Sequence, residues 1–206
     1  MGDYMQTLKY LTEEETDELY QIINQDKTLH STRNRAIFYV AKYCALRASE
    51  IGMINLTDYR PIWKTLFCKR EKNSLNNTIK IIDDDVLQAL DDYYKQRIKM
   101  DVDSKVLFIS QKGTPISRKT LHWLMKKYCA QTSISIDKHH MHTLKHTRAI
   151  ELANSGADIK DIQWWLGHRN VNNTLIYMQY TTRQQEALYE KLEKENRKNA
   201  KKKKTR

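Results

Sequence analysis

The strongest constraint on the fold of this chain is an apolar periodicity of about 3.6 residues that recurs along most of the sequence. Behind Thr12 and Glu15, whose spacing is that of a capping box, apolar residues follow at helical intervals. The same periodicity predicts further helices over residues 32–46, a short segment capped by Ser49, 83 or 84 to 94, 117–128, 140–154, 158–166, 171–177 and from 183 onward. We therefore expect a mostly α domain.

One region departs from this pattern. Residues 63–69 and 77–82 are short runs of β-forming residues separated by a polar stretch, which predicts a hairpin or the edge of a small sheet. Residues 106–109 predict another brief strand. Gly156 and Gly167 stand where two predicted helices end and need a left-handed residue. The expected fold class is mostly α with a small antiparallel β element.

The charge of the chain favours a polyanionic partner. Its 36 Lys and Arg against 25 Asp and Glu give a net charge of +11. Residues 197–206 hold seven basic residues and no acidic one, which leaves +4 for the rest of the chain. Such a surplus indicates nucleic acid first and an anionic membrane surface second.

Several other classes of protein are disfavoured. No apolar run approaches the roughly 20 residues that span a bilayer, and the first residues lack the shape of a signal peptide. The three cysteines are far apart, which argues against a structural zinc site and a disulfide framework and fits a reducing compartment. We expect a cytoplasmic protein with no membrane partner.

Six polar residues are the candidates for chemistry, although each alone is an ordinary residue: Arg47, Lys72, His142, Lys145, His168 and Tyr177. Five of them stand in distinctive segments. Residues 45–51 read ALRASEI, 142–147 read HTLKHT, 166–170 read LGHRN and 174–177 read TLIY. In this order and spacing the segments resemble the tyrosine recombinase family, the phage integrases and their relatives. The shortness of the chain resembles the fimbrial phase-switching invertases in that family.

The resemblance implies that DNA is cleaved and rejoined through a covalent phosphotyrosine. Tyr177 would attack as the nucleophile, leaving a 3′-phosphotyrosine and a free 5′-hydroxyl. Arg47 and His168 would stabilise charge on the phosphate oxygens, and His142 would bind the phosphate or assist proton transfer. Lys72, in the predicted hairpin, would protonate the leaving oxygen, with Lys69 as the alternative. This chemistry requires no metal and no cofactor.

Lys145 departs from the family pattern, in which its position carries a second arginine. Lysine keeps the positive charge but loses the planar fork, so a bidentate phosphate contact would become a point contact. We expect a working but slowed site. Arg148, one turn further along the helix, is the residue expected to assist.

The same residues allow other assignments. Tyr180 and Tyr189 are rival nucleophiles, but neither stands in the TLIY context. His142 and His146 share a helix face and could bind a metal, yet no third ligand stands nearby in the sequence. We therefore interpret His146 as a buried structural residue.

The sequence suggests three regions: a lead-in at residues 1–10, a catalytic domain at 11–182, and a C-terminal helix with a basic tail at 183–206. Many family members carry a separate N-terminal helical domain that closes around DNA. Either the chain belongs to a short branch or it is a fragment of a longer integrase. The C-terminal helix is expected to pack either on a neighbouring protomer or on its own domain. The lysine tail is either a set of phosphate contacts or a solvated terminus.

The leading hypothesis is a site-specific recombinase that integrates, excises or inverts DNA. Its partners would be double-stranded DNA, three further copies of the chain in a homotetramer on DNA, and accessory DNA-bending proteins. A bacterium, a phage or another mobile element would be its source. The first alternative is a DNA-binding regulator with the recombinase fold and weak or no catalysis. A type IB topoisomerase is a second alternative, which the LGH box and the length of the chain disfavour.

Overall fold

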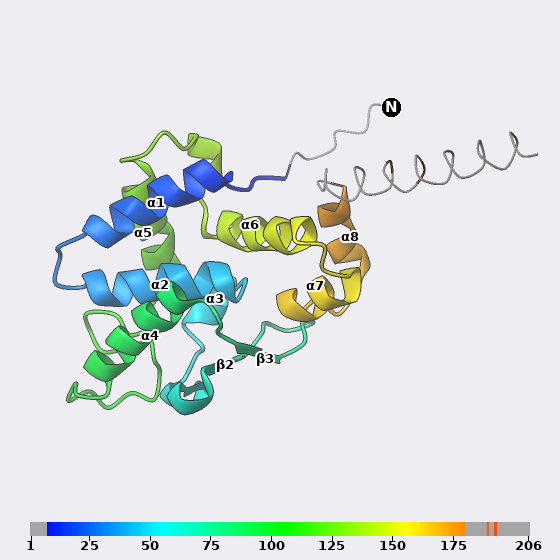
Figure 1. Cartoon of the computed structure of the whole chain (residues 1–206). Helices are drawn as coiled ribbons and strands as arrows, with labels where there is room; N and C mark the ends of the chain where they lie inside the picture. The colour runs from blue at the N-terminus through cyan, green and yellow to red at the C-terminus, as the bar shows by residue number, and fades with distance from the viewer. Residues whose placement is uncertain (1–7, 180–188, 190–191, 193–206) are drawn as a thin grey trace, which may run out of the picture.

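The computed structural model describes residues 8–179 together with Tyr189 and Leu192. Within these residues the chain is mostly helical (Figure 1). The α-helices are α1 Glu13–Gln25, α2 Ser31–Tyr43, α3 Ala48–Ile51, α4 Asp84–Arg97, α5 Arg118–Cys129, α6 Met141–Asn154, α7 Ile159–Leu166 and α8 Asn172–Met178. Short 3₁₀ turns lie at Leu56–Asp58, Pro61–Trp63 and Ile136–Lys138. The helix expected from residue 183 onward lies outside the described residues.

Most helices begin where the sequence predicts. Thr12 and Glu15 form the expected capping box, and Asp83, Ser117 and Asp158 each cap the following helix through a side-chain oxygen. The prediction for α3 was wrong, because its N-cap is Arg47 and the Ser49 hydroxyl instead hydrogen-bonds the Glu71 carboxylate. A side chain caps a helix only if the free backbone N–H groups of the first turn lie within hydrogen-bond distance of it. For α3 this geometry is set by the turn that precedes the helix.

The β element is a three-stranded antiparallel sheet in the order β1–β2–β3, with β1 Tyr59–Arg60, β2 Thr65–Cys68 and β3 Asn77–Lys80. In β2 and β3, Leu66 pairs with Ile79 and both are buried. The strand expected at residues 106–109 does not form. Only isolated bridges occur there, between Asn55 and Val106 and between Ile109 and Pro115. The backbone of this segment bonds two different short stretches, around Asn55 and around Pro115, so no continuous ladder with one partner strand forms.

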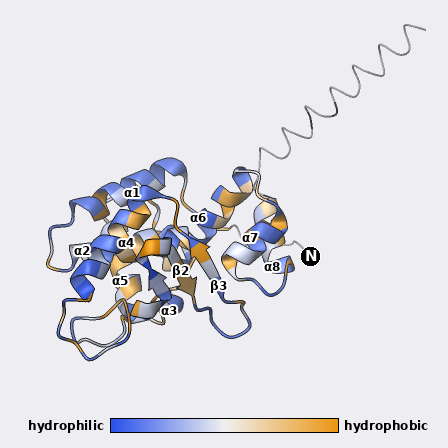
Figure 2. Ribbon diagram, turned by 60° about the horizontal axis from the view of Figure 1, so that its bottom comes forward, coloured by the Kyte–Doolittle hydropathy of each residue, from blue (hydrophilic) through white to orange (hydrophobic). Residues whose placement is uncertain are grey.

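The interior is divided into two apolar clusters. The larger one gathers residues of α1 to α5 and of the sheet around α2, whose Ala36–Ala41 stretch is buried throughout. Hydrophobic and hydrophilic residues alternate along the helices (Figure 2), as expected for helices with one buried face. The smaller cluster joins Ala45 to α6, α7 and α8, and Tyr177 is one of its members. The site described below lies where these two clusters meet.

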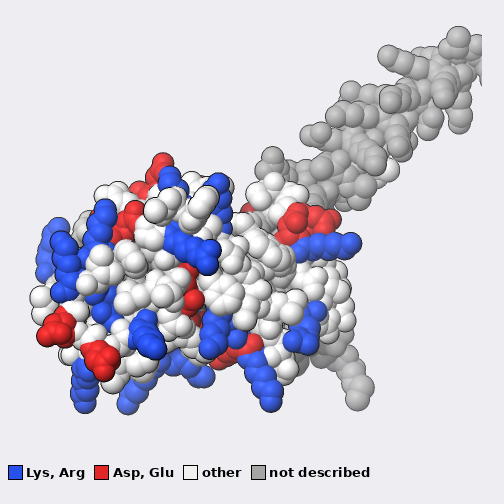
Figure 3. Space-filling model, turned by 90° about the horizontal axis from the view of Figure 1, so that it is seen from below, with Lys and Arg blue, Asp and Glu red and all other residues white. Residues whose placement is uncertain are grey.

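The surface agrees with the positive charge of the sequence. Lys and Arg side chains are spread over the face seen in Figure 3, with Asp and Glu side chains in smaller groups between them. In the described part of the chain, no helix is both long and apolar enough to cross a membrane.

Candidate active site

A pocket of about 720 Å³ lies between the start of α3, the first turns of α6, the loop after α7 and helix α8. Its walls bring together residues that are up to 169 positions apart in the sequence, from Leu8 to Tyr177. Five of the six residues predicted from the sequence line it: Arg47, His142, Lys145, His168 and Tyr177. Lys72 is not among the lining residues.

The turn that carries Arg47 into the pocket is held by two buried basic side chains. Ala45 adopts a left-handed φ of 51°, which is uncommon for a residue with a side chain and ends α2 earlier than the sequence predicts. Its carbonyl accepts hydrogen bonds from Arg70 Nη1 at 3.1 Å and Lys145 Nζ at 3.0 Å. Arg70 Nη2 also donates to the Cys44 carbonyl at 2.9 Å. These contacts fix the backbone immediately before Arg47.

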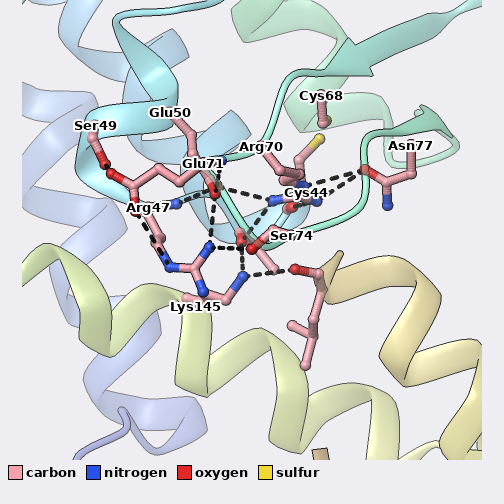
Figure 4. A network of polar contacts seen from close by, with 12 residues as sticks. Cys44, Arg47, Ser49, Glu50, Cys68, Arg70, Glu71, Ser74, Asn77 and Lys145 are labelled. Atoms are coloured by element: carbon pink, nitrogen blue, oxygen red, sulfur yellow. Dashed lines mark hydrogen bonds and ion pairs between the residues drawn. The ribbon is translucent and has the colours of Figure 1, made fainter. Parts of the chain in front are cut away.

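Glu50 is the buried carboxylate at the centre of this arrangement (Figure 4). It is fully buried and accepts hydrogen bonds from Arg47 Nη1 at 2.9 Å and from Arg70 Nη1 at 3.2 Å. It also accepts hydrogen bonds from the backbone N–H groups of Arg47 and Glu71. Burial alone would raise the pKa of Glu50, but the charges of Arg70 and Lys145 outweigh it and the pKa is lowered. Glu50 therefore stays ionised and orients the Arg47 guanidinium.

Lys145 is buried to 1% exposure, and its amine connects two walls of the pocket. Besides the Ala45 carbonyl, Nζ donates to the Leu166 carbonyl at 2.8 Å. Burial, together with the charge of Arg70, lowers the pKa of Lys145 to about 7. A neutral amine has two N–H donors, so these two carbonyls satisfy it fully.

The loop after α7 presents His168. Gly167 has φ 67°, and a Cβ there would lie 2.7 Å from the Leu75 carbonyl oxygen, so the close approach to the β2–β3 connection requires glycine. Nδ1 of His168 lies 3.0 Å from the Thr174 hydroxyl, which fixes the ring and leaves Nε2 for a ligand. Burial, followed by the charges of Lys145 and Arg47, lowers the pKa of His168 to about 3. The ring is therefore neutral.

Tyr177 closes the pocket from α8. It is 2% exposed, and its hydroxyl lies 2.9 Å from Nδ1 of His146. Burial raises the pKa of Tyr177 to about 12, against a smaller opposing effect of Arg47. The Tyr177 ring stacks on the His168 ring. The His146 and His142 rings meet edge to face, with their centroids 4.4 Å apart. Ring contacts and one hydrogen bond thus connect Tyr177 with His142, His146 and His168.

Lys72 lies in the β2–β3 connection and is exposed, as is Lys69. This connection is nevertheless part of the site, because the Ser74 hydroxyl accepts a hydrogen bond from Arg47 Nη1 at 3.1 Å. Ser74 also forms a bridge with His168, and the Leu75 N–H donates to the Gly167 carbonyl at 2.9 Å. The structure therefore holds the backbone that carries Lys72 against the pocket.

Two further residues from the sequence prediction lie elsewhere. Arg148 does not line the pocket, since its guanidinium lies 4.7 Å from the Tyr43 ring and 4.9 Å from the Trp165 ring and pairs with Glu151. Tyr189 is 65% exposed, and Tyr180 lies outside the described residues.

Sequence reasoning missed three residues that build the site. Glu50 stands three positions after Arg47, a spacing that indicates a carboxylate returning to a helix N-terminus. Arg70 continues the alternating buried pattern of Leu66 and Cys68, which indicates an inward side chain. No local signal in the sequence indicated that His146 would contact Tyr177.

Comparison with known proteins agrees with this geometry. The sequence model of the phage integrase family matches residues 9–184. The tyrosine recombinase XerC of Caldanaerobacter subterraneus subsp. tengcongensis is 36% identical over 170 residues, which are 82% of this chain and 46% of that protein. The type 1 fimbriae regulatory protein FimB of Escherichia coli K12 is 30% identical over 169 residues, 82% of both chains.

The fold is also that of solved recombinases. The structure of the XerH site-specific recombinase bound to its palindromic difH substrate superposes with a TM-score of 0.77 at 20% identity, covering 88% of this chain and 52% of XerH. The chain thus spans about half the length of XerC and of XerH. The expected fold class and the resemblance to fimbrial recombinases are confirmed. On its sequence and its fold, the chain belongs to the phage integrase family of tyrosine recombinases.

Proposed function

We propose that this protein is a site-specific DNA recombinase that breaks and rejoins DNA strands through a 3′-phosphotyrosine intermediate. The observation that carries the proposal is the pocket in which Tyr177 lies together with Arg47, Lys145, His142 and His168. A phosphodiester resists attack because its oxygens are anionic, and cationic or N–H donors fixed around it stabilise the charge that builds up.

Each residue has a distinct part in this proposal. Tyr177 Oη attacks the phosphorus, and the 5′-oxygen of the next nucleotide leaves. Arg47, held by Glu50 and Ser74, donates to the non-bridging oxygens. His168 donates to the same oxygens through Nε2, and His142 binds the phosphate from the exposed rim of the pocket.

The two lysines take different parts. Lys72 protonates the leaving oxygen, because its exposed side chain extends from a backbone that is bound to the Arg47 and His168 segments. Lys145 supplies positive charge only in its protonated form, since its pKa is about 7. An incoming phosphate anion favours that form, so Lys145 is expected to gain a proton when DNA binds.

The substrate in this proposal is double-stranded DNA, and the working unit is a homotetramer on two DNA sites, assisted by DNA-bending proteins. Family membership and the DNA-bound state of XerH support DNA as the substrate. The enzyme would act in the cytoplasm of a bacterium, where its DNA substrate lies. Residues 11–182 would form the catalytic domain, and residues 183–206 a helix and a basic tail.

A DNA-binding regulator is the second candidate. Two observations favour it: Tyr177 is 2% exposed, and Lys145 has both donors of its neutral form engaged by backbone carbonyls. In such a protein the pocket would bind the phosphate without cutting it.

A nicked suicide substrate distinguishes the two candidates. A pool of nicked duplexes with randomised flanking sequence would be incubated with wild type and with Tyr177→Phe, and protein–DNA adducts would be resolved on a denaturing gel. We expect an adduct with wild type that is absent from the variant. Binding of the pool by both proteins, with an adduct from neither, would favour the regulator.

A further inference from the structure

The contact between His146 and Tyr177 has no part in the mechanism set out above. Nδ1 of His146 lies 2.9 Å from the phenolic oxygen, at hydrogen-bond distance. Among residues 8–179 it is the one group that hydrogen-bonds this hydroxyl, and the tyrosine is 2% exposed. The nucleophilic atom of the proposed reaction therefore has a single protein partner in the described part of the chain.

The direction of this hydrogen bond follows from the charge states of the two groups. Burial raises the pKa of Tyr177 to about 12, so the phenol carries its proton at neutral pH. Burial, followed by the charges of His142 and Lys145, lowers the pKa of His146 to about 3, so its ring is neutral and has one nitrogen able to accept. The phenolic O–H must have an acceptor in this buried place, and Nδ1 of His146 is in position.

We propose that His146 is a catalytic residue that accepts the phenolic proton of Tyr177 as the nucleophile attacks. A lone pair of Tyr177 Oη forms the bond to phosphorus while the O–H bond breaks and the proton passes to Nδ1 of His146. The P–O5′ bond breaks, and its electron pair stays on the leaving oxygen, which takes a proton from the general acid. Religation reverses the sequence, with His146 returning its proton to Tyr177 Oη.

A weakly basic imidazole suffices for this step. The phenol itself gives up its proton with difficulty, but its oxygen becomes far more acidic as the bond to phosphorus forms, because electron density moves from oxygen to phosphorus. The acceptor has only to be more basic than that oxygen in the transition state. A neutral ring is also the useful form, because a protonated imidazole has no lone pair to receive the proton.

His146 and His142 have different positions relative to Tyr177. His142 lies at the exposed rim of the pocket, and its ring contacts the ring of His146 edge to face at 4.4 Å. In the described residues, the hydrogen bond to Tyr177 is made by His146 and not by His142. His142 is thereby left free for the phosphate. This inference rests on the proposed function, because it needs Tyr177 as the nucleophile.

The test compares two substitutions that differ in what they preserve. His146→Asn keeps an acceptor near the position of Nδ1 but cannot take up a proton, and His146→Ala removes the acceptor. His30→Asn is the matched control, since His30 lies at the start of α2 and lines a different pocket. The single-turnover rate of adduct formation would be measured with nicked suicide duplexes selected by wild type from the randomised pool.

We expect both His146 variants to form the adduct about 10²–10⁴-fold more slowly than wild type, the usual contribution of a general base. Added imidazole should partly restore His146→Ala, because it can occupy the vacated space and accept the proton. His30→Asn should react like wild type. A 3-fluorotyrosine at position 177 would report the hydrogen bond in the protein alone, and its ¹⁹F resonance should stay near the wild-type position in His146→Asn.

Different failures have different meanings. If wild type forms the adduct and His146→Asn forms it about as fast, the base is another group and the inference is overturned while the proposed function stands. A slow His146→Asn with a displaced ¹⁹F resonance, and no rescue of His146→Ala by imidazole, would assign His146 a purely structural role and would also overturn it. No adduct from wild type would refute the proposed function and the inference together.

Discussion

Replacing Glu50 with glutamine is the sharpest test of how this site is held together. Glutamine has nearly the same shape, but it removes the negative charge that Arg47 and Arg70 share and turns an N–H₂ group toward their donors. The side chains of Glu50 and Arg70 are both fully buried, so the guanidinium of Arg70 would lose its carboxylate where water cannot replace it.

The expected cost is about 3–5 kcal/mol, the range for breaking a buried ion pair by removing one partner. We expect a value near the lower limit, because Arg70 would keep its bonds to the carbonyls of Cys44, Ala45 and Trp165. For a domain of this size, a loss of about 3 kcal/mol corresponds to a fall in Tm of about 6–12 °C.

The assay is urea unfolding at neutral pH, with the free energy of unfolding extrapolated to water. Glu71→Gln is the control, because Glu71 also faces Arg47 but its side chain is 42% exposed, and its loss should cost less than about 1 kcal/mol. In the Arg70→Met background, Glu50→Gln should cost less than it does alone, because the stranded charge is gone.

Equal costs for Glu50→Gln and Glu71→Gln would refute this reasoning. They would mean that Arg70 needs no buried carboxylate and that its carbonyl partners suffice. Additive costs in the double variant would lead to the same conclusion, because partners in direct contact should not be independent.

Three further outcomes are expected. Lys145 has a pKa of about 7 in the native state, below the value of 10.5 for a free lysine, so the unfolded chain binds more protons between these values. The free energy of unfolding should therefore rise with pH from about 7 to about 10, by up to about 5 kcal/mol from this group, and urea unfolding of Lys145→Met should lack that rise. Lys72→Ala should slow cleavage of ordinary DNA by about 10²–10⁴-fold but not of a 5′-bridging phosphorothiolate, whose sulfur leaves without a proton. The same pattern in Lys69→Ala, and not in Lys72→Ala, would transfer the acid role to Lys69. Removing residues 197–206 should make DNA binding less sensitive to salt. The slope of the logarithm of the binding constant against the logarithm of the salt concentration should become shallower by about 0.9 for each phosphate that the tail neutralises. An unchanged slope would identify the tail as a solvated terminus.

The sequence alone determined the architecture and most of the candidate residues. Helical periodicity and caps such as Thr12, Asp83 and Ser117 depend on residues a few positions apart, so they can be read without knowing the tertiary structure. The segments around Arg47, His142, His168 and Tyr177 were recognised in the same way, from short strings whose order and spacing resemble one family.

The tertiary structure determined which side chains and carbonyl groups contact those residues and fix their positions. Glu50 and Arg70 are 20 residues apart, Arg70 reaches the Trp165 carbonyl 95 residues away, and His146 meets Tyr177 across 31 residues. The contact of His146 with Tyr177 and the position of Arg148 against the Tyr43 and Trp165 rings cannot be read from neighbours in the chain. Those properties exist only once α6, α7 and α8 have packed on the α2–α3 turn and excluded water from the groups between them.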